Sequence, residues 1–168
     1  MQIIPTEISD VKVLVPRRFK DARGYFAETY NRRLFNEAGI DAGFVQDNQS
    51  MSVESGVVRG LHYQVEPMAQ VKLVRVLRGT ILDVAVDIRR GSPTFGRHVG
   101  VTLNADDGRQ ILIPVGFAHG FATLEPNTEV LAPMSARSVA SCVMAALTLV
   151  SALTALADVS TVAPVALV

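Results

Sequence analysis

The chain has 168 residues, of which 49% are hydrophobic and 19% charged, and its sixteen basic and sixteen acidic side chains leave no net charge. This composition indicates one soluble domain, and the charge balance argues against a general nucleic-acid surface or a polybasic membrane patch. The single Cys142 excludes an intrachain disulfide, and the N-terminal residues lack the pattern of a signal peptide, so we expect a cytoplasmic location.

Short β-rich runs, separated by turn signals, recur through the first 131 residues. Several alternate apolar and polar residues, as half-buried antiparallel strands do, and together they cover residues 11–16, 24–30, 71–79, 80–88, 97–104, 109–115 and 119–125. The segment 31–39 predicts a helix, with Asn31 as its N-cap and Gly39 as its C-terminal stop. Many evenly spaced strands with one short helix predict an all-β fold, either a β-sandwich or a jelly roll.

The last 37 residues differ in composition from the rest. Between Ala132 and Val168 only Arg137 and Asp158 are charged, and this tail contains no aromatic residue and no glycine. The uncharged stretch between the two charges is long enough to span a membrane, but it is so rich in Ala, Ser and Thr that we expect no insertion. A packed helix and a poorly ordered tail both remain open. We therefore expect a domain of residues 1–131 followed by a divergent tail of residues 132–168.

The three histidines have different surroundings in the sequence. His98 has no polar partner in its local pattern, so we expect it on the exposed face of a strand. His62 and His119 each follow a glycine-containing bend, RGLH and PVGFAH, and such bends can turn side chains into the mouth of a barrel. The pair could be catalytic or purely structural. Tyr63 and Gln64 follow His62, so the His-x-His pair of many metal barrels is absent and we expect no metal site.

Arg23, Arg59 and Lys72 lie beside glycine bends or on an otherwise apolar strand. A cation that faces the inside of a small barrel is costly unless an anion meets it, and a phosphate-bearing ligand would supply that anion. Alternatively, these cations form structural ion pairs with Glu28 or Asp83. The residue pattern alone leaves both interpretations open.

Five segments of the chain occur together in a characteristic order: DARGYFAETY, FVQDNQS, GVVRGLHYQ, QVKLVRVLRGTILDVAVDIRRGSPTFG and ILIPVGFAHGFATLE. Their order and spacing closely resemble the dTDP-4-dehydrorhamnose 3,5-epimerase family over about residues 1–131. The resemblance implies a cupin-like jelly roll without metal or cofactor, which acts as a homodimer in dTDP-L-rhamnose synthesis. It implies dTDP-4-dehydro-6-deoxyglucose as the substrate, with inversion at C3 and C5. Enzymes that epimerise only C3 or only C5 share these motifs.

The same resemblance implies roles for particular residues. His62 resembles the general base that removes the protons at C3 and C5, and Lys72 resembles the group that faces the ketone oxygen and stabilises the enolate. The positions that resemble the family's substrate contacts are Arg23, Phe26, Glu28, Gln46, Asn48, Arg59 and His119.

The resemblance stops after Leu131. The family's next residue is the tyrosine that returns a proton to the opposite face of the sugar, and this chain has Ala132 there. The family tyrosine that stacks on thymine is replaced by Ser138, and the late aspartate that orients the base histidine is missing. We hypothesise a reading-frame change near this point, with a divergent natural C-terminus as the alternative. We accordingly expect either an epimerase of impaired activity or a non-catalytic protein that binds sugar nucleotides.

Overall fold

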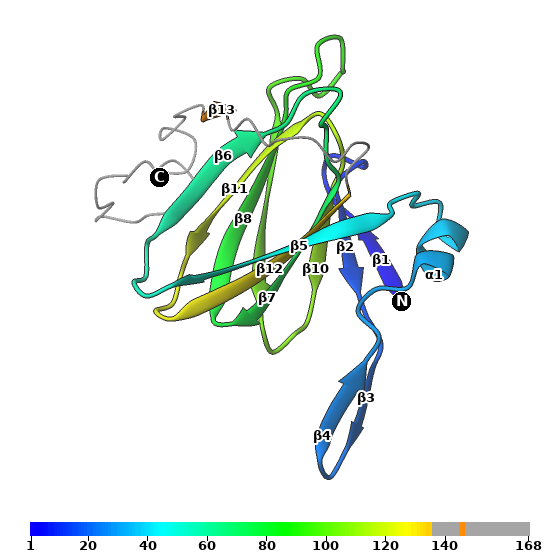
Figure 1. Ribbon diagram of the computed structural model, residues 1–168, viewed down its shortest axis with the longest axis vertical. Helices are drawn as coiled ribbons and strands as arrows, with labels where there is room; N and C mark the ends of the chain where they lie inside the picture. The colour runs from blue at the N-terminus through cyan, green and yellow to red at the C-terminus, as the bar shows by residue number, and fades with distance from the viewer. Residues whose placement is uncertain (136–144, 147–168) are drawn as a thin grey trace.

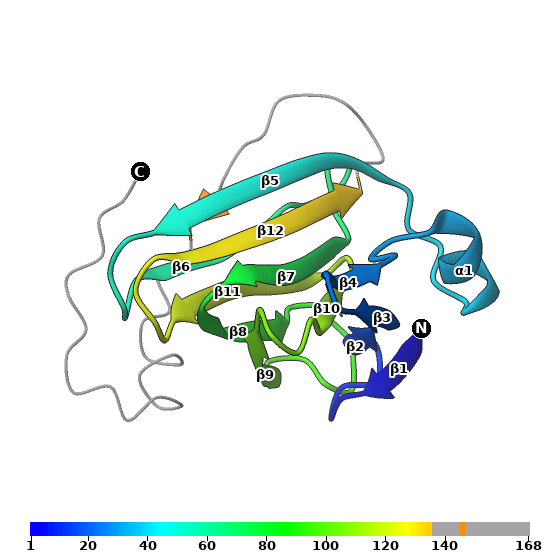
Figure 2. The same ribbon diagram turned by 90° about the horizontal axis from the view of Figure 1, so that it is seen from below.

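The computed structural model describes residues 1–135 and 145–146 of the chain. Two antiparallel sheets pack face to face and account for most of these residues, as Figures 1 and 2 show. The predicted all-β architecture is therefore confirmed.

Each sheet combines strands from distant parts of the sequence. In spatial order, the six-stranded sheet consists of β1 (Gln2–Pro5), β2 (Lys12–Val15), β10 (Gln110–Ile113), β7 (Lys72–Arg78), β12 (Thr128–Ser135) and β5 (Phe44–Ser52). The five-stranded sheet consists of β13 (Ala145–Ala146), β6 (Val58–Tyr63), β11 (Phe117–Thr123), β8 (Thr80–Asp87) and β9 (His98–Asn104). A separate hairpin, β3 (Arg18–Asp21) and β4 (Gly24–Ala27), precedes the helix α1 (Arg32–Glu37).

Each β-rich run predicted from the sequence contains a strand, but the sequence did not predict β1, β3, β5, β6 or β12. The run 24–30 leaves the strand conformation after Ala27. Strand β5 reads FVQDNQSMS and is largely exposed, because it forms an edge of its sheet. A polar edge strand lacks the apolar alternation on which a strand prediction depends.

The main core lies between the two sheets. Its buried members are Ile8, Val11, Val74, Val76, Ile81, Ala85, Val99, Leu103, Ile111, Ile113, Phe117, Phe121 and Val130. Burial of each large aliphatic or aromatic side chain stabilises the fold by about 1.5–3 kcal/mol. Apart from Ile8 and Val11, these residues come from strands β7 to β12, which belong to both sheets, so the inward faces of these strands can be read from them.

The predicted helix and both of its ends are confirmed. The Asn31 side chain accepts hydrogen bonds from the backbone N–H groups of Arg33 and Leu34, and Gly39 follows the last turn with a φ of +74°. Phe35 is 1% exposed and joins a second cluster with Leu14, Leu73 and Leu112. The helix therefore covers the outer face of the six-stranded sheet.

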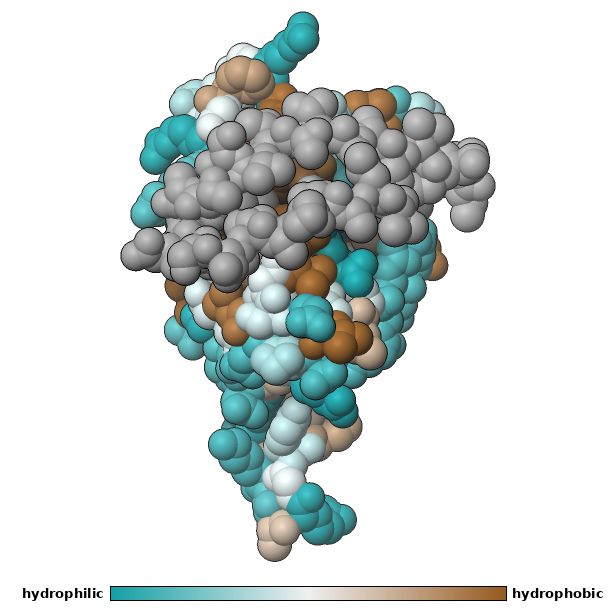
Figure 3. Space-filling model, turned by 90° about the vertical axis from the view of Figure 1, so that its left-hand side faces the viewer, coloured by the Kyte–Doolittle hydropathy of each residue, from teal (hydrophilic) through white to brown (hydrophobic). Residues whose placement is uncertain are grey.

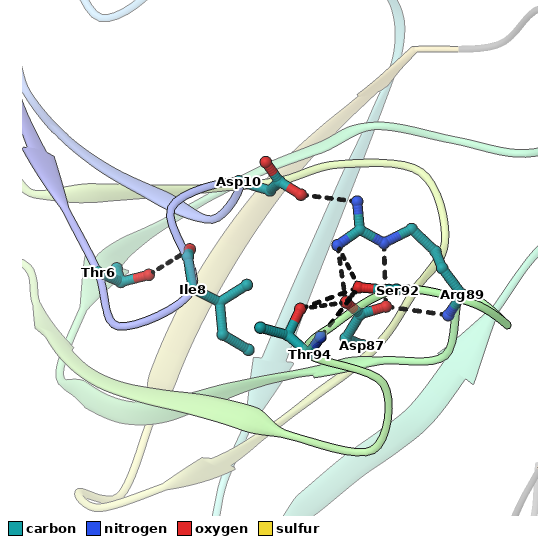
Figure 4. A network of polar contacts seen from close by, with 7 residues as sticks. All are labelled: Thr6, Ile8, Asp10, Asp87, Arg89, Ser92 and Thr94. Atoms are coloured by element: carbon teal, nitrogen blue, oxygen red, sulfur yellow. Dashed lines mark hydrogen bonds and ion pairs between the residues drawn. The ribbon is translucent and has the colours of Figure 1, made fainter.

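The Arg89 side chain joins the loop after β1 to the loop after β8, because it pairs both with Asp10 in the first loop and with the buried Asp87 at the end of β8 (Figure 4). Arg89 donates to both carboxylate oxygens of Asp87 at 2.9 and 2.7 Å, and to Asp10 at 2.6 Å. Ser92 and Thr94 each donate to Asp87 at 2.6 Å. These hydrogen bonds, above all the one from Arg89, hold the pKa of Asp87 well below its usual range.

The β3–β4 hairpin stands away from the two sheets as a narrow extension, visible in Figures 1 and 3. Its side chains are mostly exposed, including Phe19, Tyr25 and Phe26. No helix in the described part of the chain is long and apolar enough to cross a membrane. The expectations of a helical or poorly ordered tail concern residues 136–144 and 147–168, which lie outside the described residues.

Candidate active site

Strands β6, β11 and β8 direct a group of polar side chains into the space between the sheets. His62 is paired with His119, and Arg59 is paired with Phe121, a member of the core. His119 is also paired with Ala85, another core residue. Because directly opposed residues in a sheet share a face, His62, His119 and Arg59 all face inward.

The opposite sheet contributes a second group to the same space. Val130 belongs to the core, and alternation along β12 places Ala132 and Met134 on the same inward face. Register then places Asn48 beside Ala132, and places both Gln46 and Lys72 beside Met134. Gln46, Asn48 and Lys72 therefore face the histidines from the other sheet.

Two amides and a thioether form a chain of hydrogen bonds on this second wall. Gln46 donates to the Asn48 side-chain oxygen at 2.8 Å, and Asn48 donates to the Met134 sulfur at 3.4 Å. The sequence did not point to Met134, which lies beyond the motifs and has no recognisable pattern. Its sulfur fixes which way the Asn48 amide is turned, because only the NH₂ group can donate.

His62 has the most strongly altered acidity in the site. Burial, followed by the positive charge of Lys72 and the proximity of His119, lowers the pKa of His62 from its ordinary 6.5 to about 3. The centroids of the His62 and His119 rings are 5.7 Å apart. His62 is thus a neutral imidazole at physiological pH, which is the form that can accept a proton.

Asp83 forms a hydrogen bond with the His119 ring. The His119 Nε2 and Asp83 Oδ2 atoms are 2.8 Å apart, and the two residues are 3% and 0% exposed. An ionised carboxylate can only accept, so the Nε2–H group of His119 donates this hydrogen bond to Asp83. Nδ1 is buried and has no hydrogen-bond partner within the described part of the chain. The sequence suggested Asp83 only as a partner for a cation; a charged residue in the middle of the apolar run TILDVAVDI was the available signal.

The two cations of the site, Lys72 and Arg59, differ in their burial and in their hydrogen-bond partners. Lys72 is 5% exposed, which confirms that this cation faces the interior. Arg59 donates to the Ser52 hydroxyl at 3.1 Å and to the Met51 carbonyl at 3.2 Å, so it is anchored to the end of β5. Neither bond is to a carboxylate, and the ion pairs with Glu28 or Asp83 that the sequence left open are not formed by Arg59.

Three residues assigned to the site by resemblance lie apart from it. Arg23, whose side chain is 90% exposed, forms an ion pair with Asp21 at 2.6 Å, and not with Glu28 or Asp83. Phe26 is 70% exposed on the same hairpin. Glu28 lies in the segment between β4 and α1, beside a small pocket that it shares with Arg17 and other residues. A single chain therefore does not bring these residues to His62.

His98 is exposed at the start of β9, as predicted. Among the described residues, no group of three or more His, Cys, Asp or Glu side chains is placed to hold a metal ion. The fold and the site together define a two-sheet β-protein with a group of histidine, lysine and amide side chains between its sheets.

The chain matches the family model of dTDP-4-dehydrorhamnose 3,5-epimerase over residues 5–143, and it belongs to this family. A family enzyme from Shigella flexneri is 55% identical over 130 residues, which cover 77% of this chain and 71% of that protein. The crystal structure of the family enzyme from Bacillus anthracis, with TDP and pyrophosphate bound, has 45% identity and a TM-score of 0.82. That match covers 87% of this chain and 83% of the other. The expected family and its cupin-like jelly roll are confirmed.

A more distant structure is the 3'-monoepimerase ChmJ of Streptomyces bikiniensis in complex with dTDP-quinovose. It has 28% identity and a TM-score of 0.83, and the match covers 96% of this chain and 81% of the other. Another structure of ChmJ, with dTDP bound, is of a double mutant in which one histidine and one tyrosine are replaced. The two replaced positions have the same separation in sequence as His62 and Ala132 of this chain.

Proposed function

We propose that this chain is a dTDP-4-dehydrorhamnose 3,5-epimerase, which inverts dTDP-4-dehydro-6-deoxyglucose at C3 and C5. The observation that carries the proposal is a neutral, half-buried His62 that lies close enough to Lys72 for the lysine charge to lower its pKa. The protons at C3 and C5 are both α to the C4 ketone. Their removal needs a base on one side and a positive charge at the ketone oxygen, and these two residues supply both.

The low pKa of His62 in the free protein is compatible with its role as a base. Part of the depression comes from the charge of Lys72. As the enolate forms, its oxygen gains negative charge and offsets that of Lys72, so the pKa of His62 rises while the proton is transferred. The ammonium group therefore stabilises the transition state more than the ground-state ketone, and the imidazolium is stabilised at the same moment.

The remaining residues of the two walls would hold the sugar nucleotide. Arg59 suits the diphosphate, because a guanidinium can form paired hydrogen bonds with phosphate oxygens. His119 presents an acceptor nitrogen to a sugar hydroxyl. Gln46 and Asn48 line the wall beside Lys72 and offer amide groups to the sugar or the base. These assignments rest on the inward faces of their strands and on the family resemblance.

A homodimer would explain the position of Arg23 and Phe26. Both lie on the protruding hairpin, and Glu28 follows it, so these residues can reach a sugar nucleotide in the site only from a second copy of the chain. The edge strand β5 also leaves Val45 and Met51 exposed, at 68% and 53%, and Val53 directly after it is 59% exposed. Large exposed apolar side chains on an edge strand favour an interface. Light scattering of the purified chain would give twice its 18.1 kDa mass, and a monomer would contradict this assignment.

Ala132 is the main argument for reduced activity. Its methyl group points into the site and can return no proton to the sugar, so reprotonation of the opposite face depends on water. The position of Ala132 favours a second candidate, a non-catalytic protein that binds sugar nucleotides. The likeness to a 3'-monoepimerase favours a third candidate, inversion at C3 alone.

The division of the chain near residue 131 also remains our proposal, as do its origin in a reading-frame change and the cytoplasmic location. Strand β12 continues to Ser135, and the family match continues to residue 143. Sequencing the gene tests the frame change: another frame downstream should encode a Tyr-Lys-like continuation with tryptophan and acidic residues. A gene without such a frame would refute it and leave natural divergence.

The function is tested by incubating the chain with the 4-keto sugar nucleotide in D₂O and following deuterium at C3 and C5 by NMR. Exchange at both carbons, with slow formation of the rhamno product, is expected. Exchange at C3 alone would show a monoepimerase. Binding of the nucleotide without exchange at either carbon would refute the proposed epimerase activity and would favour the non-catalytic protein that binds sugar nucleotides.

A further inference from the structure

Arg59 and His62 face the same space although they are three positions apart along β6. In a regular strand, side chains alternate between the two faces, so residues three apart point in opposite directions. A regular β6 would therefore turn either Arg59 or His62 away from the site.

A β-bulge removes this conflict. His62 is paired with His119 and Arg59 with Phe121, so three steps along β6 match two steps along β11, and the register shifts between His119 and Phe121. Gly60 and Leu61 together oppose the single residue Gly120. An extra residue of this kind returns the following side chain to the original face.

Two glycines allow the bulged strand to lie against β11. A Cβ on Gly120 would lie 2.8 Å from the Arg59 carbonyl oxygen and 3.1 Å from Gly60 Cα. A Cβ on Gly60 would lie 2.5 Å from Gly120 Cα and 2.8 Å from the His119 carbonyl oxygen. The obstructing atoms are backbone, so a side chain at either position would force the strands apart. Gly120 does not have a positive φ, and its need for glycine comes from this close approach alone.

We propose that Gly120 is a positioning residue, which acts by holding the bulge of β6 so that His62 stays beside His119 and opposite Lys72. The inference rests on the proposed function for its catalytic consequence but not for its geometry. Arg59 has its own anchors on Ser52 and Met51, whereas His62 follows the bulge. Displacement of β6 should therefore move the base more than the Arg59 guanidinium, which its two hydrogen bonds hold at the end of β5.

Gly120→Ala tests this proposal, with Gly43→Ala as the matched control. A Cβ on Gly43 would meet only the Arg32 guanidinium at 3.8 Å, and Gly43 has no positive φ. For Gly120→Ala we expect deuterium exchange at the sugar to fall about 10- to 100-fold, because misplacement of a catalytic group by about 1 Å costs up to about that much. Binding of dTDP should stay within about threefold, because Arg59 keeps its anchors.

The imidazole titration of His62, followed by NMR and assigned with His62→Asn, gives a readout that needs no catalysis. We expect the pKa of His62 to rise in Gly120→Ala from about 3 toward 6.5, because the ring moves away from Lys72 and His119 and gains solvent. If the wild-type chain shows no deuterium exchange, the proposed epimerase activity is refuted. The His62 titration still tests whether Gly120 positions His62.

An unchanged His62 titration in Gly120→Ala would overturn the proposal, as would a loss of dTDP binding equal to the loss of exchange. If Gly120→Ala does not fold, Gly120→Ala/Leu61→Ala relieves a further contact, that of Leu61 Cδ2 at 3.1 Å. If neither variant folds while Gly43→Ala does, Gly120 is needed for folding and has no separate role in positioning His62. That result would also overturn the proposal.

Discussion

The depressed pKa of His62 makes the stability of the fold depend on pH in a way that one substitution can isolate. In the unfolded chain a histidine titrates near 6.5, whereas in the folded chain His62 titrates at about 3. As the pH falls, the unfolded chain therefore takes up a proton on His62 at a higher pH than the folded chain does. The stability that His62 contributes is complete above about pH 6.5 and is lost progressively as the pH falls toward about 3.

The size of the effect follows from this gap. One pH unit corresponds to about 1.4 kcal/mol, so a change from pH 7 to pH 5 would lower the free energy of unfolding by about 2 kcal/mol. Partial exposure of the ring to solvent reduces this contribution to about 1–2 kcal/mol. Asp87 does not contribute to the stability difference between pH 7 and pH 5. The pKa of its carboxyl is lowered from 3.8, so the stability that Asp87 contributes is lost only at more acidic pH.

Urea unfolding at pH 7 and pH 5 measures the effect in the wild type, in His62→Asn and in His98→Asn. Between pH 7 and pH 5, the free energy of unfolding should fall by about 1–2 kcal/mol more in the wild type and in His98→Asn than in His62→Asn. The reason is that His62→Asn alone lacks the imidazole at position 62. Equal losses in all three proteins would show that His62 is not held as a buried neutral base, and the reasoning would fail.

Three further substitutions test other parts of the site and fold. Ala132→Tyr should raise formation of the rhamno product by about 10²–10⁴-fold, the usual contribution of a general acid; an unchanged rate would mean that position 132 does not face the reacting carbons. Lys72→Met should lower deuterium exchange at least about 100-fold, because the enolate loses its positive charge, while dTDP binding measured by calorimetry stays within about threefold. Asp87→Asn should lower the free energy of urea unfolding by about 3 kcal/mol, because the buried Asp87 carboxylate accepts hydrogen bonds from Arg89 and two hydroxyl groups that a neutral amide cannot all accept. Asp107→Asn, at the exposed Arg109 pair, should cost less than about 1 kcal/mol, and equal losses would contradict the difference in burial.

The sequence predicted those parts of the fold that local chemistry determines. Asn31 and Gly39 define the helix because an N-cap and a left-handed residue depend only on their own neighbours. The apolar runs of β7 and β8 were also recognisable. Strand β5 was not, because polar residues on both of its faces remove the apolar alternation, and β6 was not, because Gly60 and the bulge interrupt its alternation.

The site was predictable as a set of residues but not as an arrangement. Motif resemblance named His62 and Lys72, and the structure places them on opposing sheets. The pairing of His119 with Asp83 depends on the register of β8 and β11, which no local pattern specifies. The separation of Arg23 from His62 depends on the direction of the β3–β4 hairpin. Such long-range relations arise from strand pairing and not from nearby residues.

The central claim is that His62 removes a proton from the sugar, and deuterium exchange in D₂O tests it most directly. The wild type, His62→Asn and His98→Asn should be compared at equal saturation with the 4-keto sugar nucleotide, with dTDP binding measured for each. We predict exchange in the wild type and in His98→Asn, and at least about a 100-fold loss in His62→Asn with dTDP binding preserved. Exchange in His62→Asn at the wild-type rate would contradict the account.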